Sequence, residues 1–155
     1  MSLRRATEAD LETLARIHRQ AFSPGWSGEE IAELGSGAGV FALLIEDPVA
    51  RAMILCRTVA GETEILTLAV APEARRQGLA RTLIEAALRV ARKDGAQSVV
   101  LEVAVDNDPA RTLYETSQFV QVGRRRGYYR RADGSEADAV IMRHDLNSGA
   151  ISPYH

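Results

Sequence analysis

The segment 98–105, with the sequence SVVLEVAV, constrains the fold more than any other part of this chain. Six of its eight residues are apolar and four are valine, a composition that favours an extended strand. A short apolar run without alternation is typical of a strand that is buried on both faces. Such a strand needs a covering layer on each side, so we expect a sheet between two layers of helices.

Six other segments carry strand patterns that would extend this sheet. The first residues, SLRR, can form a short strand, and longer strands are expected at 40–46, 49–58, 63–71, 119–127 and 138–144. The turns EDP and AGE separate the first three longer strands, which favours an antiparallel meander. The last two strands flank a polar loop that contains the turn ADG.

Four segments have apolar residues at helical spacing. Helices are predicted at about 8–21, from Ser27 to Gly35 or Gly37, from Gly78 to about Gly95, and after Asn107 or Asp108. Thr7 with Asp10 is close to a capping box, Ser27 with Glu30 is a cleaner one, and Pro109 suits a first helical position. The predicted fold is therefore α/β, a mixed and mostly antiparallel sheet of about six or seven strands flanked by about four helices.

Length and charge fit one ordinary globular domain. The chain has 155 residues and a net charge of −2, so we expect a single domain over 1–146 and a C-terminal tail at 147–155. Because the charge is nearly balanced, DNA or RNA binding is not expected. The basic clusters, Arg75 with Arg76 and 124–126 with 130–131, are short enough to be solvated loop charge.

Neither a secretory signal pattern nor an apolar run of the ~20 residues that span a bilayer is recognisable, so we expect a cytoplasmic protein without membrane contact. Cys56 is the single cysteine and lies in the apolar run MILC, where a small buried side chain is expected. His18, His144 and His155 lack the spacing of metal ligands, so each is expected to be a surface or hydrogen-bonded histidine and no metal is predicted.

The stretch VAPEARRQGLARTLI joins a predicted strand to a predicted helix through Pro72, a basic segment and Gly78. Unpaired N–H groups at a helix start attract anions, and glycine lets a phosphate approach the backbone. Arg75, Arg76 and Arg81 can add positive charge. The spacings of a P-loop and of a dinucleotide fingerprint are both missing. By spacing alone, the stretch predicts either a structural break or an anion site.

The same stretch resembles a family signature. RRQGLA matches the [QR]-x-x-G-x-[GA] pattern of the GCN5-related N-acetyltransferase (GNAT) superfamily, with Arg75 first, Gly78 central and Ala80 where glycine is commoner. The resemblance covers about residues 3–146. It extends to the RimI-type ribosomal-protein alanine N-acetyltransferases through AFSPGWS, VVLEVAVDNDPARTLYETSQF and RRGYYRRADGSEADAVIMRHDL.

This resemblance implies acetyl-CoA as the cosubstrate and no metal. It implies that backbone amides of the loop bind the pyrophosphate, over Arg75, Arg76, Gln77, Gly78, Leu79, Ala80 and Arg81. It assigns the pantetheine arm and the carbonyl oxygen of the acetyl group to the backbone of Leu68, Ala69 and Val70. Asn107 matches an asparagine that contacts the cofactor, although helix capping alone would explain it.

Acetylating an amine requires a neutral nitrogen, whereas an α-amino group has a pKa of ~8 and is mostly protonated at neutral pH. Glu102, the one acid within 98–105, matches the family's proton acceptor; from the residues alone it could equally be solvated or salt-bridged. Tyr114 has the position of the general acid that protonates the leaving thiolate, and it could also anchor a helix to the sheet.

The acceptor amine is left open by these residues. The resemblance implies the N-terminal α-amine of a protein, with a ribosomal small-subunit protein as first candidate, bound between Phe22 and Trp26 on one side and a loop carrying Tyr128 and Tyr129 on the other. A free small amine, such as a polyamine or an antibiotic, is the alternative acceptor. A CoA-binding module without catalysis is a third hypothesis. We expect a monomer or weak dimer.

One position departs from the family pattern. Gln118, in YETSQF, stands where the family usually has a glycine in the left-handed conformation. A residue with a Cβ costs ~1 kcal/mol there, and it could shift Tyr114.

Overall fold

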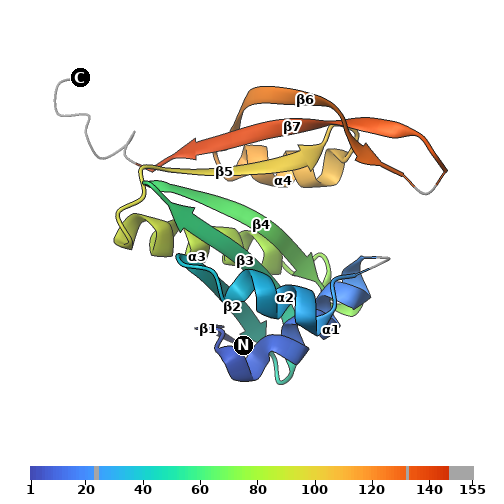
Figure 1. The fold of residues 1–155 in the computed structure, drawn as a ribbon. Coiled ribbons are helices and arrows are strands. Elements are labelled where there is room, and N and C mark those ends of the chain that lie inside the picture. Colours follow the sequence, from blue (N-terminus) through green and yellow to red (C-terminus); the bar gives the residue numbers. More distant parts are fainter. Residues whose placement is uncertain (23–24, 132, 147–155) are drawn as a thin grey trace.

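A seven-stranded mixed sheet carries the fold, in the order β1-β2-β3-β4-β5-β7-β6 (Figure 1). The computed structural model describes residues 1–22, 25–131 and 133–146, so the predicted tail at 147–155 lies outside it. Neighbouring strands are antiparallel except β4 and β5, which are parallel. The strands are β1 (Ser2–Arg5), β2 (Val40–Glu46), β3 (Ala50–Val59), β4 (Glu62–Val70), β5 (Ser98–Ala104), β6 (Val120–Arg130) and β7 (Glu136–Asp145). The predicted fold class is confirmed.

Helices cover both faces of the sheet. The described residues form α1 (Leu11–Ala21), α2 (Gly28–Gly35), α3 (Leu79–Lys93) and α4 (Asp108–Thr116), with short 3-10 helices η1 (Glu8–Asp10) and η2 (Pro72–Ala74). Figure 1 shows α1 and α2 over the face opposite to α3. The predicted capping box of α2 is confirmed, because Ser27 N–H donates to Glu30 Oε1 and Glu30 N–H donates to Ser27 Oγ, each at 3.1 Å.

Alternate residues of the strands divide the core into two layers. Phe41, Leu43 and Ile45 of β2 belong to the layer that contains the apolar face of α3. Ala42 and Leu44 of the same strand belong to the layer under α1 and α2. Both faces of β2 are therefore buried, which explains why its sequence is apolar at nearly every position.

The strand β5 corrects one prediction. Val99, Leu101 and Val103 are buried, as expected. The alternate residues of this strand, among them Glu102 and Ala104, are only half-buried. Their face of β5 borders a cleft instead of a second packed layer, so the expectation of burial on both faces was wrong for that side.

The last two strands also differ from the prediction, because they continue across most of the expected polar loop. β6 runs on to Arg130 and β7 begins at Glu136. Tyr128 and Tyr129 therefore lie in a strand and not in a loop. β6 is an edge strand with register shifts against β7, and most of its side chains are exposed. Charged residues and bulges on an edge strand protect the strand from pairing with other chains. They also remove the alternation of polar and apolar residues that would have marked the end of β6.

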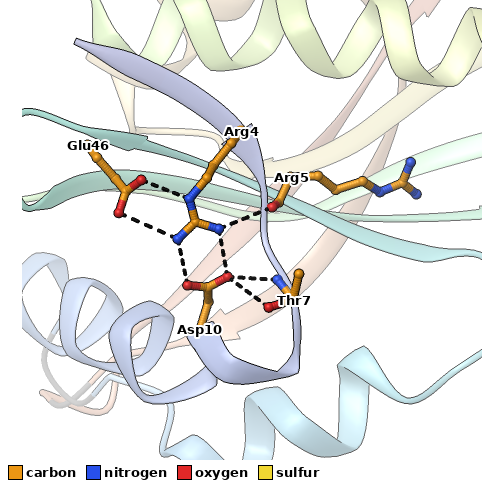
Figure 2. Close-up of polar contacts among 5 residues, drawn as sticks. All are labelled: Arg4, Arg5, Thr7, Asp10 and Glu46. Atoms are coloured by element: carbon orange, nitrogen blue, oxygen red, sulfur yellow. Dashed lines mark hydrogen bonds and ion pairs between the residues drawn. The ribbon is translucent and has the colours of Figure 1, made fainter.

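Arg4 of β1 ties the first strand to the start of the first helical segment and to β2 (Figure 2). Its guanidinium donates to the two carboxylate oxygens of Asp10 at 2.9 and 2.8 Å, and to Glu46 Oε1 at 2.8 Å. Asp10 Oδ2 also accepts the N–H of Thr7 at 2.8 Å. The hydrogen bonds from Arg4 and then from Thr7 lower the pKa of Asp10 to about 2.

We predict that Asp10→Asn lowers the free energy of unfolding at neutral pH by about 1.5–3 kcal/mol, the range for hydrogen bonds to charged groups. Because the pKa of Asp10 is lowered in the folded state, its contribution is complete above its ordinary value of 3.8 and is lost as pH falls toward about 2. Urea denaturation of wild type and variant should therefore give curves that converge over that interval. A pH-independent difference would contradict this account; Asp47→Asn, at an exposed site, is the control.

Gln118 adopts the left-handed conformation that its position predicts, with φ of 72°. The turn lets Phe119 N–H donate to Tyr114 O at 3.0 Å, and it directs the Phe119 ring into the core. The two rings meet edge to face at 5.8 Å. The strained residue thus lies next to Tyr114 without touching the cleft.

We predict that Gln118→Gly raises the free energy of unfolding by about 1 kcal/mol, because glycine adopts this conformation without a Cβ clash. Gln118→Ala keeps the Cβ and should leave stability nearly unchanged. Thermal unfolding of the two variants decides the point: equal stability of both would show that the conformation is not strained.

Candidate active site

The strands β4 and β5 pair at one end only. Their register covers three pairs, from Glu62 with Ser98 to Glu64 with Val100, and both strands then continue apart (Figure 1). The separation begins where β4 carries a bulge: Leu55 of β3 faces Thr67 whereas Cys56 faces Ile65. A bulge bends its strand and increases its twist. β4 and β5 therefore splay apart beyond Glu64, and the bulge explains this separation.

The separation changes what the backbone of β4 can bind. Ala71 N–H donates to Arg51 O at 2.8 Å, on the β3 side. Because successive amides of a strand point to opposite sides, the N–H groups of Leu68 and Val70 point toward β5 and that of Ala69 toward β3. Of the three residues predicted to bind the pantetheine arm, two thus present N–H groups to the opening.

A cleft of about 560 Å³ lies where β4 and β5 separate. Its walls come from β4, β5, α1, α4 and the segment before α2, and its lining includes Leu68, Val70, Glu102, Asn107, Tyr114, Phe22, Trp26 and Tyr129. A second hollow of about 590 Å³ adjoins it and shares Val70, Ala80, Asn107, Ala110 and Leu113 with it. The shared residues mark a junction, so the two hollows form one path from the loop before α3 to the aromatic residues of α1.

The second hollow is bordered by the predicted phosphate loop. Gly78 caps α3 with φ of 77°, and a Cβ there would meet no atom within 4 Å, so its left-handed conformation is what requires glycine. Arg75, Arg76, Gln77 and Gly78 are exposed. The first turn of α3 therefore presents unpaired N–H groups to a hollow lined by arginines, which suits a doubly charged pyrophosphate.

Three other residues predicted to contact the cofactor also have structural contacts. Leu79 is buried in the core, so only its backbone can face a ligand. Arg81 lines the second hollow but donates to Thr116 Oγ1 at 2.8 Å, which joins α3 to α4. Asn107 caps α4, with its Oδ1 accepting from Ala110 N–H at 3.3 Å, and it borders both hollows.

Glu102 lines the cleft and is salt-bridged. Its Oε1 lies 3.2 Å from Arg125 Nε, and its side chain is 19% exposed. The Arg125 guanidinium also lies over the ring of Tyr128, 5.0 Å from the centroid. The salt-bridged alternative from the sequence is thus what the structure contains, and the same carboxylate still borders the cleft. Sequence reasoning missed Arg125, because nothing distinguishes it within a run of three arginines.

Tyr114 is buried between α4 and the sheet and also lines the cleft. Burial raises the pKa of Tyr114 to about 12, since a phenolate is poorly solvated there. The structure accordingly combines the two alternatives for this residue, a core anchor and a group at the cleft. Tyr129 also lines the cleft, and its hydroxyl donates to Glu102 O at 3.4 Å. Tyr128 is 51% exposed and outside the lining.

Three aromatic side chains line the end of the cleft that is away from the loop before α3. The ring of His18 stacks on Trp26 at 4.5 Å and lies 4.6 Å from the ring of Phe22. His18 is buried and hydrogen-bonded, as one of the predicted alternatives for it stated. Its place in the site was missed, because a lone histidine in a helix carries no signal of its contacts with distant residues. Ser23 and Pro24, part of the predicted FSPGWS bend, lie outside the described residues.

Across the described ranges, no cluster of three or more His, Cys, Asp and Glu side chains is arranged to hold a metal. Within the same ranges, no helix is long and apolar enough to cross a membrane.

Comparison with known proteins agrees with this geometry. The model of the acetyltransferase (GNAT) family matches residues 10–119. The ribosomal protein bS18-alanine N-acetyltransferase of Escherichia coli K12 is 32% identical over 133 residues, which cover 86% of this chain and 89% of that protein. The crystal structure of the ribosomal-protein-S18-alanine N-acetyltransferase from E. coli superimposes with a TM-score of 0.86 at 29% identity, covering 94% and 93% of the two chains. Arabidopsis thaliana NAA60 in complex with acetyl-CoA has the same fold, with a TM-score of 0.81 at 22% identity over 95% and 99% of the chains.

We predict that Tyr114 titrates far above an ordinary tyrosine. The near-ultraviolet absorbance of phenolate, measured as the difference between wild type and Tyr114→Phe, should stay flat through the ordinary tyrosine pKa of ~10 and rise only toward about 12. A rise near the ordinary value would show that the side chain is solvated and not packed as described.

Proposed function

We propose that this chain, which belongs to the acetyltransferase (GNAT) family, transfers the acetyl group of acetyl-CoA to the N-terminal α-amine of a protein. The observation that carries the proposal is the continuous path from the exposed loop at Gly78 to Glu102 and Tyr114 between the parted strands. The name of the E. coli relative, which matches along most of both chains, supports a protein N-terminus as the acceptor and a ribosomal small-subunit protein as the first candidate.

Acetyl-CoA would supply the activated acetyl group as a thioester. The backbone amides at the start of α3, with Arg75 and Arg76 beside them, would hold its pyrophosphate. The N–H groups of Leu68 and Val70 would pair with its extended arm as an added strand would. This arrangement is supported by the hollow that joins the loop to β4.

The side chains of the cleft would move two protons. Glu102 would accept a proton from the incoming amine, directly or through a water molecule, because its carboxylate borders the cleft on β5. Tyr114 would donate a proton to the leaving thiolate, giving the CoA thiol. This phenol is protonated at neutral pH, as a proton donor must be, although burial raises its pKa to about 12 and makes it a weaker acid than a free tyrosine.

The acceptor would enter at the end away from the phosphate loop. Phe22, Trp26 and Tyr129 line that end, whereas Tyr128 lies outside the lining, where it contacts Arg125. Apolar rings suit a small uncharged first side chain, such as that of alanine, better than the repeated charges of a polyamine. A ribosomal-protein acceptor would place the reaction in the cytoplasm.

We predict that Glu102→Gln and Tyr114→Phe each lower kcat about 100-fold, the usual worth of a general base or acid. The matched control for the first is Glu64→Gln, since Glu64 is also a sheet glutamate in an ion pair, with Arg57 at 3.1 Å, but lies outside the cleft lining. Steady-state kinetics should give the control the wild-type kcat. Near-normal turnover in both cleft variants would remove these roles.

The function itself is tested with a panel of acceptors and a mass-spectrometric readout. A peptide that begins with alanine should gain one acetyl group at its α-nitrogen with release of CoA thiol, whereas the same peptide blocked at its N-terminus should not react. Acetylation of polyamines or aminoglycosides alone would favour the small-amine alternative. Binding of acetyl-CoA without thiol release across the panel would favour the non-catalytic module.

A further inference from the structure

His18 joins three separate pieces of chain at the acceptor end of the cleft. It lies on α1, its Nδ1 accepts the backbone N–H of Trp26 at 2.8 Å, and its Nε2 lies 3.2 Å from Thr67 Oγ1 on β4. The Trp26 ring stacks on the imidazole nearly in parallel, at 11°. Thr67 follows directly after the bulge of β4. One side chain thus connects the aromatic wall with the strand that departs from β5.

These contacts determine the state of the imidazole ring. A backbone N–H can only donate, so Nδ1 must accept and carries no proton. The single proton of the neutral ring is then on Nε2 and is donated to the Thr67 hydroxyl. A protonated ring has no acceptor at Nδ1, so protonation would break the bond to Trp26 and leave that amide facing another N–H.

Gly25 allows the wall to lie this close to the helix. A Cβ at this position would lie 2.5 Å from Arg19 Cα, a backbone atom that cannot move aside. The backbone before Trp26 therefore rests directly on the last turn of α1. Since the segment cannot move further inward, the bond to His18 and the stacking of Trp26 on its ring oppose movement outward.

We propose that His18 is a positioning residue: through Trp26 and Thr67 it holds the acceptor wall against β4, and only its neutral form does so. The inference rests on the proposed function, because it concerns how the acceptor is bound. It assigns the residue no contact with the reacting atoms. Its loss should therefore weaken acceptor binding and leave acetyl-CoA binding intact.

The surroundings of the ring favour this neutral form. Burial lowers the pKa of His18, and the charge of Glu30 on α2 raises it by a smaller amount. β4 presents the uncharged Thr67, and on α1 the ring of Phe22 lies beside it. The other titratable groups lining the cleft are Glu102, which is paired with Arg125, and the tyrosines of α4 and β6. The wall should therefore be formed at neutral pH and released under acidic conditions.

Trp26 allows a test that needs no substrate, because it is the only tryptophan of the chain. An imidazolium ring in contact with indole quenches its fluorescence. The emission of the wild type should fall as pH decreases, with a midpoint below the ordinary histidine pKa of 6.5. His18→Asn removes the titrating ring but places an amide oxygen near the Nδ1 position, so its emission should stay constant over the same pH range.

Kinetics on an alanine-first peptide provide the second arm. His18→Phe keeps an aromatic ring but neither hydrogen bond, and should raise the peptide KM about tenfold, with kcat and the acetyl-CoA KM within about twofold. His18→Asn should recover most of the peptide KM at neutral pH. Thr67→Val, which removes only the Nε2 partner, should have an intermediate effect.

The pH dependence of acceptor binding is measured as a ratio of two peptide KM values. The acceptor amine titrates equally with both enzymes, so the peptide KM of the wild type divided by that of His18→Asn should rise as pH falls through the fluorescence midpoint. Wild-type Trp26 emission that does not change with pH, or an unchanged peptide KM in folded His18→Phe, would overturn the inference. If the wild type acetylates no peptide, the proposed function fails, and this shows separately from the fluorescence result.

Discussion

β4 and β5 share three residue pairs and then separate, which leaves the middle of a seven-stranded sheet open. Strands in a sheet interior rarely leave backbone N–H groups unpaired, because an unpaired buried amide costs about as much as a lost hydrogen bond. The amides of Leu68 and Val70 are therefore placed to bind an extended ligand. The bulge at Leu66 is what produces this opening, and the sheet remains continuous through the pairs at its other end.

The opening also explains why residues distant in the sequence meet. Glu102 lies on the half-buried face of β5 that borders the opening, and Tyr114 reaches the same space from α4. Gly78 starts α3 just beyond the end of β4, so the phosphate loop lies at one end of the cleft. α1 crosses the other end, where His18 contacts Thr67. A single departure from regular pairing thus positions an anion site, a carboxylate, a phenol and an aromatic wall.

Local patterns predicted most of the fold. The capping box at Ser27, the strand predicted at 63–71 and found at Glu62–Val70, and the left-handed Gln118 each depend on a few neighbouring residues, and all three are present. The end of β6 was misplaced, because an exposed edge strand has no alternation between polar and apolar residues. The bulge of β4 could not be predicted either, since it depends on how β3 and β4 pair.

The candidate site could be predicted only where a motif or resemblance marked a residue. Glu102 stands out as an acid in an apolar run, and Gly78 stands out before a helix. Arg125 and His18 carry no such signal, because their roles follow from contacts with residues 23 positions earlier in the chain, at Glu102, and 49 positions later, at Thr67. Long-range contacts of this kind are visible only once the strands are arranged.

A crystal structure with bound CoA would show directly whether the separated strands β4 and β5 hold the cofactor. We expect the extended arm of CoA to lie between β4 and β5, with hydrogen bonds to the N–H groups of Leu68 and Val70, and the pyrophosphate to lie at Gly78. CoA bound elsewhere, or β4 and β5 closed by further pairing beyond Glu64, would contradict this expectation.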